Sequence, residues 1–300
     1  MKHKRRFSEK AGAPAGRFPL PPGRSGRVLT LALLCPLLWG ACSTAPKRPA
    51  EIHVRRDGAE KQLELANRQA EQGDFDGALA LLELSRILAV TSDDLSLRVR
   101  ITLSRGNVFF YQGRREEAAH EWAAALAEAE ESGDAELGAV ARIYTARGRL
   151  LSAAPEEKGR IAAAVAREVN AEIPRIKKDT LSIALGWTVI GLAEKETRRF
   201  REAEDSLRKA LVIHEKGNYL EQAAYDWYVI ASIRSVAGDY TGAVEALEAA
   251  LALDRRAENS WGLAMDWRAL TEVYRKAGMT DQAEAAAARS GEILQALGRE

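Results

Sequence analysis

An interval of about 40 residues recurs along this chain, and a fixed period of this length is typical of stacked-repeat proteins. Two sets of three residues keep the interval, namely Trp187, Trp227 and Trp267, and Ala203, Ala243 and Ala283. Ala78 and Ala118 repeat it nearer the N-terminus. The period restricts the fold, because each unit of such an array buries its apolar face only against its neighbours. These arrays present long binding surfaces and rarely carry a reaction centre.

The placement of proline indicates that the repeats are helical. Seven of the nine prolines precede residue 50, and only Pro155 and Pro174 follow. The rest of the chain is rich in Ala, Leu, Glu and Arg, which favour helices, whereas proline breaks a helix interior. No strand-like alternation of Val, Ile and Thr competes with this interpretation. We therefore predict an all-α protein, and its 46% of hydrophobic residues are ample for a core.

An apolar segment near the N-terminus predicts export. Residues 28–41 carry no charge and follow a basic leader rich in Pro and Gly. The segment is too short to span a bilayer, which needs about 20 residues, but it suits the hydrophobic region of an export signal. Trp39, Gly40 and Ala41 then precede Cys42, and a polar stretch containing proline follows.

This arrangement resembles the lipobox of bacterial lipoproteins, in which a peptidase cleaves before a cysteine that carries diacylglycerol and palmitate-type chains. The resemblance implies a cleaved signal peptide over residues 1–41, lipidation of Cys42, and a lipidated cysteine and flexible linker over 42–58. Trp39 stands where Leu is usual, and the leader before the apolar run, which occupies positions 1–27, is long. An ordinary secretory signal and an uncleaved anchor are the alternatives. Several acyl chains hold a protein on a bilayer stably, whereas one is marginal.

Removal of residues 1–41 would change the charge balance. They hold eight of the 44 Lys and Arg but only one of the 43 Asp and Glu, which leaves 36 basic and 42 acidic residues. Because this remainder lacks the basic stripe of nucleic-acid-binding proteins, we do not expect a nucleic-acid partner. Cys35 would leave with the signal, and Cys42 alone cannot form an intramolecular disulfide.

The repeats share a turn with a small residue at a fixed place. In the last three units the turn reads Arg199-Phe200-Arg-Glu-Ala203, Gly238-Asp-Tyr240-Thr-Gly-Ala243 and Gly278-Met-Thr-Asp-Gln-Ala283. In the first two it reads Gln72-Gly73-Asp-Phe75-Asp-Gly-Ala78 and Gln112-Gly113-Arg-Arg-Glu-Glu-Ala118. A tryptophan, then Gly-Asp-Tyr/Phe-x-x-Ala, then Ala-Leu resembles the tetratricopeptide repeat (TPR) pattern. Glycine suits the turn, the small residues allow helices to approach, and the tryptophans are expected as buried wedges between helices.

The resemblance implies a right-handed α-solenoid of about six TPR helix hairpins over residues 59–296, in a superhelical domain of 59–300. The usual repeat has about 34 residues, and the longer period of this chain is similar to that of kinesin light chains. We expect the additional residues between one hairpin and the next, as near Gly133 and Gly217. A degenerate middle unit would place Pro155 in the first turn of its second helix and end at Pro174.

No set of residues predicts catalysis. His3, His53, His120 and His214 are scattered, and none pairs with another at helical spacing. The chain has neither a phosphate-binding glycine loop nor a serine in a nucleophile elbow. We therefore predict that the protein is not an enzyme, binds no metal and carries no cofactor except the lipid on Cys42.

Candidate site residues follow from the resemblance. In TPR proteins the first helices of the hairpins line a concave groove that binds an extended peptide or a partner helix. The expected partner-binding groove consists of Leu63, Asn67, Leu103, Asn107, Phe110, Arg149, Tyr225, Tyr228 and Arg268. Asn67 and Asn107 occupy a place from which family members often bind a peptide backbone, but the basic carboxylate clamp of chaperone-binding members is not reproduced. An ordinary surface role is the alternative for each residue.

The combined pattern predicts a non-catalytic, membrane-anchored scaffold that gathers protein or peptide partners in the cell envelope. Ser43 after the cysteine favours an outer-membrane anchor facing the periplasm if the enterobacterial sorting rule applies. The alternatives are an assembly factor of the pilotin or outer-membrane assembly type, an activator of a peptidoglycan enzyme, and self-assembly through the alanine-rich final helix that begins at Asp281.

Cys42→Ser tests the lipidation. Because the acyl chains attach to this cysteine, the substitution is expected to abolish incorporation of radioactive palmitate into the expressed chain. Labelling that persists in the variant would contradict the lipobox interpretation.

Overall fold

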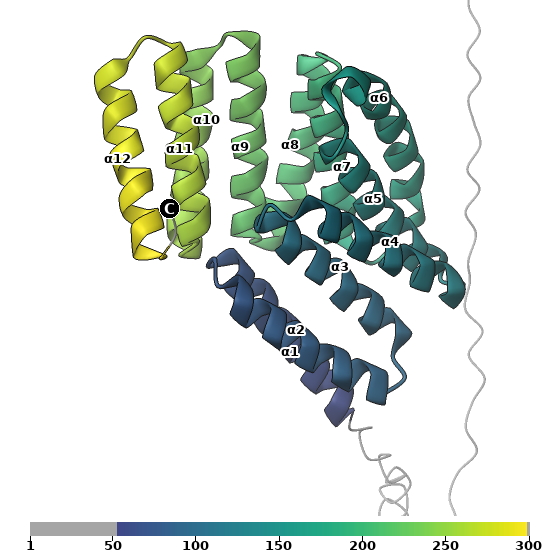
Figure 1. Cartoon of the computed structure of the whole chain (residues 1–300). Coiled ribbons are helices and arrows are strands. Elements are labelled where there is room, and N and C mark those ends of the chain that lie inside the picture. The colour runs from purple at the N-terminus through teal and green to yellow at the C-terminus, as the bar shows by residue number, and fades with distance from the viewer. Residues whose placement is uncertain (1–52, 299–300) are drawn as a thin grey trace, which may run out of the picture. The chain divides into compact units, whose positions relative to one another are not determined.

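Helices form every long element of the computed structural model, which describes residues 53–298 (Figure 1). In chain order they are α1 (Val54–Glu71), α2 (Phe75–Thr91), α3 (Leu95–Tyr111), α4 (Arg115–Ser132), α5 (Ala135–Leu151), α6 (Pro155–Glu172), the 3₁₀ turn η1 (Ile173–Arg175), α7 (Thr180–Glu196), α8 (Phe200–Gly217), α9 (Leu220–Ala237), α10 (Tyr240–Ala257), α11 (Ser260–Lys276) and α12 (Thr280–Ala296). The predicted all-α class is confirmed, since no strand occurs among these residues.

Consecutive helices pair as six hairpins, from α1–α2 to α11–α12, which confirms a TPR-like α-solenoid of six units. α1 begins at Val54, ahead of the predicted boundary at residue 59. The predicted signal peptide and Cys42 lie outside the described residues. Across 53–298, none of the helices is long and apolar enough to cross a membrane.

The long period of the repeat comes from long helices. Each of the twelve helices has 17 or 18 residues, and the turns after α4 and α8 contain only Gly133 and Asp134, and Asn218 and Tyr219. The expectation that the additional residues lie between hairpins is therefore wrong. Longer helices bury more surface along each seam, whereas longer turns would add backbone that must be ordered without packing.

Most of the turns contain one residue in the left-handed backbone conformation, with a positive φ. Gly238 has a φ of +89°, a conformation that glycine adopts without strain. Where glycine is missing, Arg198 takes the same place with a φ of +60°. The Asp239 carboxylate accepts a hydrogen bond of 2.9 Å from the backbone N–H of Gly242 and so caps α10.

Small residues bring paired helices close together, as predicted. A Cβ atom on Gly191 of α7 would lie 2.8 Å from Leu207 Cγ and 3.1 Å from the carbonyl oxygen of Ala203, both on α8. Ala203 and Ala243 are fully buried at equivalent positions of α8 and α10. Any larger side chain at these places would overlap atoms of the facing helix.

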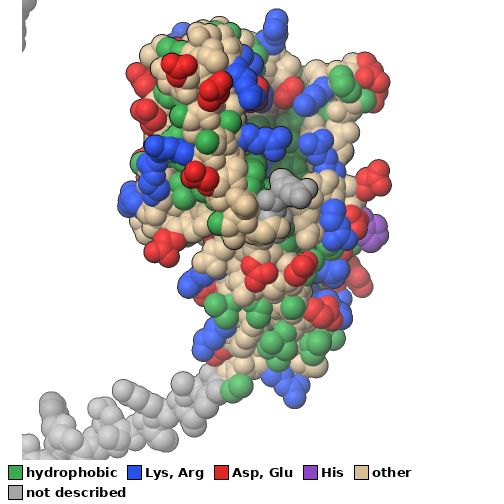
Figure 2. All heavy atoms as spheres, turned by 60° about the vertical axis from the view of Figure 1, so that its left-hand side comes forward, with side chains coloured by type: hydrophobic (Ala, Val, Ile, Leu, Met, Phe, Trp, Pro, Cys, Tyr) green, Lys and Arg blue, Asp and Glu red, His purple; other side chains and the backbone are tan. Residues whose placement is uncertain are grey.

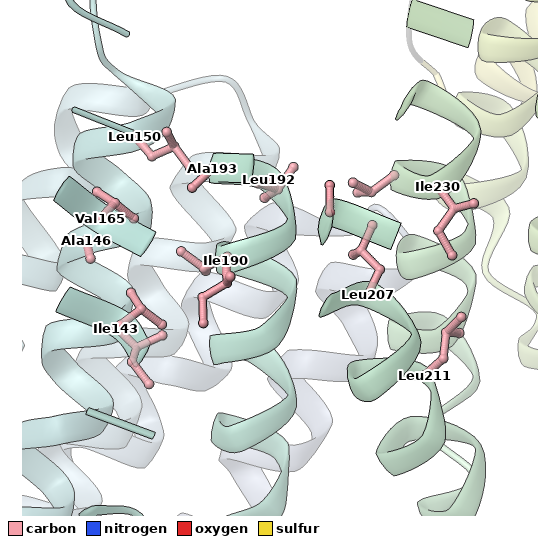
Figure 3. Packing of buried hydrophobic residues seen from close by; sticks show 14 of the residues in the cluster. Ile143, Ala146, Leu150, Val165, Ile190, Leu192, Ala193, Leu207, Leu211 and Ile230 are labelled. Carbon is pink, nitrogen blue, oxygen red and sulfur yellow. The ribbon is translucent and has the colours of Figure 1, made fainter. Parts of the chain in front are cut away.

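The hydrophobic core continues from one hairpin to the next (Figure 3). Ile190 of α7 lies between the side chains of the third hairpin and Leu207 of α8. The other labelled residues of this core are Ile143, Ala146, Leu150, Val165, Leu192, Ala193, Leu211 and Ile230. Each hairpin therefore completes the core of its neighbours and has no separate core of its own.

The periodic tryptophans differ from their predicted role as buried wedges. Trp187, Trp227 and Trp267 are half-buried at the edge of the core. The Lys209 ammonium lies 4.0 Å from the ring centroid of Trp187, and the Arg289 guanidinium lies 4.7 Å from that of Trp267. Long cations of the second helices thus cover these two rings, which binds the hairpin together by cation–π attraction.

The buried tryptophan is Trp122 of α4, which is only 1% exposed. Its Nε1 donates a hydrogen bond of 3.2 Å to the carbonyl oxygen of Leu103. A Cβ atom on Gly106 of α3 would lie 2.3 Å from that nitrogen, and one on Gly148 of α5 would lie 2.9 Å from Trp122 Cε3. The ring fits between α3 and α5 because both helices carry glycine where they meet it.

The third hairpin contains the irregular segment that its prolines predicted. Pro155 begins α6, and Pro174 lies in η1, after which Asp179 caps α7. The carboxylate of Glu136 accepts hydrogen bonds from the backbone N–H groups of Lys177 and Lys178, at 2.8 and 2.7 Å. The insertion is thereby attached to the start of α5.

Two substitutions test this packing. Trp122→Ala is expected to lower the free energy of unfolding by about 3–5 kcal/mol, because it leaves a cavity between α3 and α5. Ala243→Leu is expected to cost about 1–3 kcal/mol by separating α9 from α10. Chemical denaturation measures both, with the half-buried Trp227→Ala as a milder control. Equal losses for Trp122→Ala and Trp227→Ala would contradict the assignment of the buried ring.

Candidate partner-binding site

The first hairpin returns to contact the last two hairpins. Gln222 of α9 donates a hydrogen bond of 3.5 Å from Nε2 to Oε1 of Glu71 at the end of α1. Trp261 of α11 meets the Phe75 ring of α2 edge-on, with ring centroids 5.8 Å apart, and packs against the core of the first hairpin. Figure 1 shows the α1–α2 turn below α9 and α11. The six hairpins thus bring their two ends together, so that several first helices face a shared interior.

Tyr111, the last residue of α3, lies in that interior. Its side chain is 38% exposed, yet burial raises its pKa to about 12. The charged and ionisable groups that act on it are Arg147 of α5, Glu71 of α1 and Tyr225 of α9. A side chain that is open to solvent but surrounded by three other helices lies in a hollow rather than on a convex surface. Figure 2 shows such a hollow in the upper half of the view, with hydrophobic side chains inside it.

Aromatic rings of the first helices line this interior. The rings of Phe110 and Tyr111 lie edge to face at 6.0 Å, and Trp122 lies 6.1 Å from Tyr144. On α9 the rings of Tyr225 and Tyr228 stack with an interplanar angle of 13°. We call the surface formed by Phe110, Tyr111, Tyr144, Arg147, Tyr225 and Tyr228 the inner face. Rigid rings with polar tips suit contact with an extended peptide.

Arg147 of α5 is the cation of the inner face. It is only 6% exposed, and its guanidinium lies 4.8 Å from the ring centroid of Phe110 and 5.8 Å from that of Trp122. Within residues 53–298 no carboxylate lies within ion-pair distance of it and no hydrogen bond satisfies it. The nitrogens of Arg147 are not among the buried atoms that lack a partner, so the guanidinium faces the solvent of the interior and is open to an anionic group there. Arg147 is therefore the strongest candidate on the inner face for contact with an anionic ligand.

Three of the predicted groove residues lie elsewhere. Leu63 of α1 and Leu103 of α3 are both 4% exposed and belong to the hydrophobic core, so they support the helices from behind. The two leucines occupy the same position of successive repeats, and at this position the side chain faces the second helices. Their spacing therefore grouped them correctly but did not show which side of the helix they occupy. Arg149 forms an ion pair with Glu168 of α6, a second helix, and is exposed there.

The remaining predicted residues are accessible in different degrees. Asn67 and Arg268 are exposed, whereas Phe110, Tyr225 and Tyr228 are half-buried on the inner face. Asn107 is also half-buried, and its Oδ1 has no hydrogen-bond donor in the described part of the chain. An enclosed acceptor without a donor raises the free energy of the unliganded state.

Arg147 and Trp261 were not among the residues predicted from the sequence. Asn67, Asn107 and Arg147 are equally spaced along the chain, at the interval of the repeat. The period could therefore have placed all three at one position of successive first helices. Trp261 could not have been found in this way, because its contact with Phe75 joins residues at opposite ends of the solenoid.

Buried polar residues also repeat between hairpins. The carboxylate of Asp226 on α9 is fully buried, accepts a hydrogen bond of 2.7 Å from Thr188, and lies 2.7 Å from His214 Nδ1. One repeat later, Asp254 and Asp266 occupy the places of His214 and Asp226. The histidine–carboxylate pair of one seam is thus replaced by two carboxyl groups in the next.

The two carboxyl groups are expected to hold one proton between them. Burial raises the pKa of both, and the charge of Asp254 raises that of Asp266 further. Asp254 Oδ1 accepts a hydrogen bond of 2.9 Å from Asn259 Nδ2, and a hydrogen-bonding interaction with Asp254 also raises the pKa of Asp266. Two like charges that interact in a buried region between hairpins cannot both form without a large electrostatic cost.

A polar pocket of about 440 Å³ adjoins this seam, between the end of α1 and the turns that precede α9 and α11. Glu71 and Glu221 line it. Burial raises the pKa of Glu71 to about 7, and the charges of Glu221 and Asp254 contribute to the rise. The described residues contain no group of three or more His, Cys, Asp or Glu side chains able to hold a metal ion.

Comparison with known proteins supports the architecture. No protein-family model matches this sequence, and no curated protein matches it. The chain is similar to BtubC (BKLC) from P. vanneervenii, at 19% identity and a TM-score of 0.50 over 80% of this chain and 92% of that one. It is also similar to a Rap protein complexed with competence and sporulation factor, at 13% identity and a TM-score of 0.54 over 80% of this chain and 76% of that one. The similarity to aspartyl phosphate phosphatase F from Bacillus subtilis has 12% identity and a TM-score of 0.52, over 83% of this chain and 76% of that one. At these identities the likeness shows a shared helical-repeat fold.

The carboxyl pair predicts a pH dependence of stability. The unfolded chain ionises these groups near pH 4, whereas the folded chain holds the shared proton to much higher pH. The contribution of this pair to the free energy of unfolding is therefore fully present below about pH 4. It is lost as the pH rises through the pKa values of the pair in the folded protein. The amide of Asp266→Asn can donate a hydrogen bond to Asp254, and it does not ionise as the pH rises. We expect it to stabilise the protein by about 1–3 kcal/mol at pH 8 and by much less at pH 5.

Thermal unfolding at the two pH values measures this difference. Asp226→Asn is the matched control and is not expected to stabilise, because Thr188 and His214 already satisfy Asp226. A gain for Asp266→Asn that does not change with pH would refute the shared proton.

Proposed function

We propose that this TPR-like solenoid is a non-catalytic scaffold that binds an extended, anionic segment of a protein partner on its inner face. It would do so as a lipid-anchored component of the cell envelope, held at the outer membrane and facing the periplasm. The unpaired, buried Arg147 within an aromatic surface is the observation that carries the binding proposal.

The chemistry of the inner face favours a peptide with a carboxylate. A carboxylate would neutralise Arg147 and accept two parallel hydrogen bonds from its guanidinium. Tyr225 and Tyr228 would contact the apolar part of the segment, since their stacked rings lie half-buried on α9. The Rap protein of similar fold was solved in complex with competence and sporulation factor, which supports a protein or peptide as the class of partner.

The lipid anchor rests on the sequence around Cys42. An apolar run, two small residues and a cysteine, followed by Ser43 and a polar stretch, support lipidation and an envelope location. An anchor would concentrate the scaffold at the membrane surface, where a weak peptide interaction gains from high local concentration.

Site-specific crosslinking in cells tests the binding proposal. A photoreactive benzoylphenylalanine at Tyr228 is expected to form an adduct with the partner, whereas the same group at exposed Val212 of α8 is not. Arg147→Met keeps an apolar stem beside the rings but removes the charge. It is expected to reduce the Tyr228 adduct by about ten-fold or more, because a desolvated charge-assisted contact is lost.

Arg149→Met is the control, because its charge pairs with Glu168 away from the inner face. Thermal unfolding of both variants establishes that they are folded. An adduct equally strong in Arg147→Met, or equally strong from Val212, would refute the proposed site.

A further inference from the structure

An apolar patch covers the outer side of the first hairpin. Five of the ten large hydrophobic side chains that are exposed among residues 53–298 lie on α1 and α2, with exposures between 44% and 71%. We call them the terminal patch, and they are Val54, Leu65, Leu84, Ile87 and Val90. Figure 2 shows hydrophobic side chains gathered on the lower part of the unit, where the chain enters it.

The patch is not required by the packing of the hairpin. The inward side of α2 carries Leu82, Ser85 and Ala89, all fully buried, and Ser85 donates a hydrogen bond of 2.7 Å to the carbonyl oxygen of Ala59 on α1. Leu84 and Ile87 are one helical turn apart on the opposite side of the same helix. The equivalent side of α8 carries Val212, which is 65% exposed, so this side is the outer surface of the solenoid and is not covered by a neighbouring hairpin.

We propose that the terminal patch docks on the surface of a lipid bilayer. The inference rests on the anchor in the proposed function, because the anchor is what brings this hairpin to the membrane. Only a short stretch of chain separates Cys42 from Val54. At about 3.5 Å per residue it reaches at most about 40 Å. The first hairpin is consequently the part of the fold held nearest to the lipid.

Charges of both signs flank the patch: Glu64 and Glu83 are exposed beside Leu65 and Leu84, and basic residues that suit anionic headgroups lie near Val54. Arg55, next to Val54, donates a hydrogen bond to the carbonyl oxygen of Thr91 and makes no ion pair with any carboxylate of the described residues. Lys47 and Arg48 precede it in the sequence. Each basic residue close to an anionic bilayer contributes about 1 kcal/mol of attraction. Apolar side chains with flanking cations are the combination that holds a helix in the interface.

A bilayer fits the patch better than a peptide does. Leu84 and Ile87 lie on the outer surface of α2, whereas the inner face already provides the enclosed aromatic surface for a segment of protein. Docking would also restrain the orientation of the scaffold relative to the membrane, which a flexible linker alone would leave free.

Fluorescence in vesicles tests the proposal. Ile87→Cys, labelled with the environment-sensitive dye NBD, is prepared in the full, anchored chain and in the chain of residues 43–300, which keeps every core residue described. Vesicles consist of phosphatidylethanolamine and phosphatidylglycerol, with or without quenching doxyl lipids. The label is expected to shift to shorter wavelength and to be quenched by doxyl lipids in the anchored chain. The matched control is Val212→Cys on α8, which is 65% exposed and distant in the sequence from the patch, and which should show neither effect.

The anchor-free chain of residues 43–300 separates the patch from the lipid anchor. It is expected to bind anionic vesicles measurably, and Leu84→Ser with Ile87→Ser should weaken its partition by about ten-fold or more, since each large side chain contributes about 1.5 kcal/mol on burial. If the anchored chain floats with vesicles but the label at residue 87 behaves like that at residue 212, the docking proposal is overturned while the anchor stands. If the anchored preparation carries no lipid and the anchor-free chain still binds through Leu84 and Ile87, the anchor fails and the patch stands. A blue shift that grows with protein concentration without vesicles would overturn the proposal in favour of self-association.

Discussion

The close approach of paired helices at small residues is the constraint on which the rest of this structure depends. Gly191 of α7 meets Leu207 and the backbone of Ala203 on α8 so closely that any side chain would overlap them. Ala243 occupies the equivalent position of α10 and is fully buried. Because one hairpin cannot bury its own apolar seam, this contact must recur in every hairpin before the core is continuous. Long helices then extend each seam, which accounts for a long period despite short turns.

The return of the first hairpin to α9 and α11 decides what the solenoid can bind. It brings Phe75 against Trp261 and Glu71 against Gln222, and it places Tyr111 among side chains from several first helices. The interior therefore contains aromatic rings and a buried cation close together. In an open array the same residues would lie on a broad, solvated surface, where Arg147 could be hydrated and would attract an anion only weakly.

Charge inside the seams has a different role. His214 with Asp226, and Asp254 with Asp266, lie between hairpins and are almost inaccessible. Asp226 has hydrogen-bond partners on both oxygens, whereas Asp266 Oδ2 has none among the described residues, and the raised pKa values of the second pair favour a protonated form. Its neighbours Glu71 and Glu221 lie at the contact between the first hairpin and the last ones. Rising pH therefore adds repulsion at the contact that encloses the inner face.

The sequence alone determined the helical class, the number of hairpins, the turn glycines, the small residues of the seams and the prolines of the third hairpin. Each of these follows from local conformation or from a period that one chain displays without reference to its neighbours. The sequence also predicted Phe110, Tyr225 and Tyr228 as residues of one groove, and all three are half-buried side chains of first helices. Only the tertiary structure decided that Leu63 and Leu103 face the core, that Trp122 rather than the periodic tryptophans is buried, and that Arg147 has no counter-ion. These features depend on small rotations between successive hairpins, which accumulate along the solenoid until α11 contacts α1. The spacing of residues in the sequence does not contain these rotations.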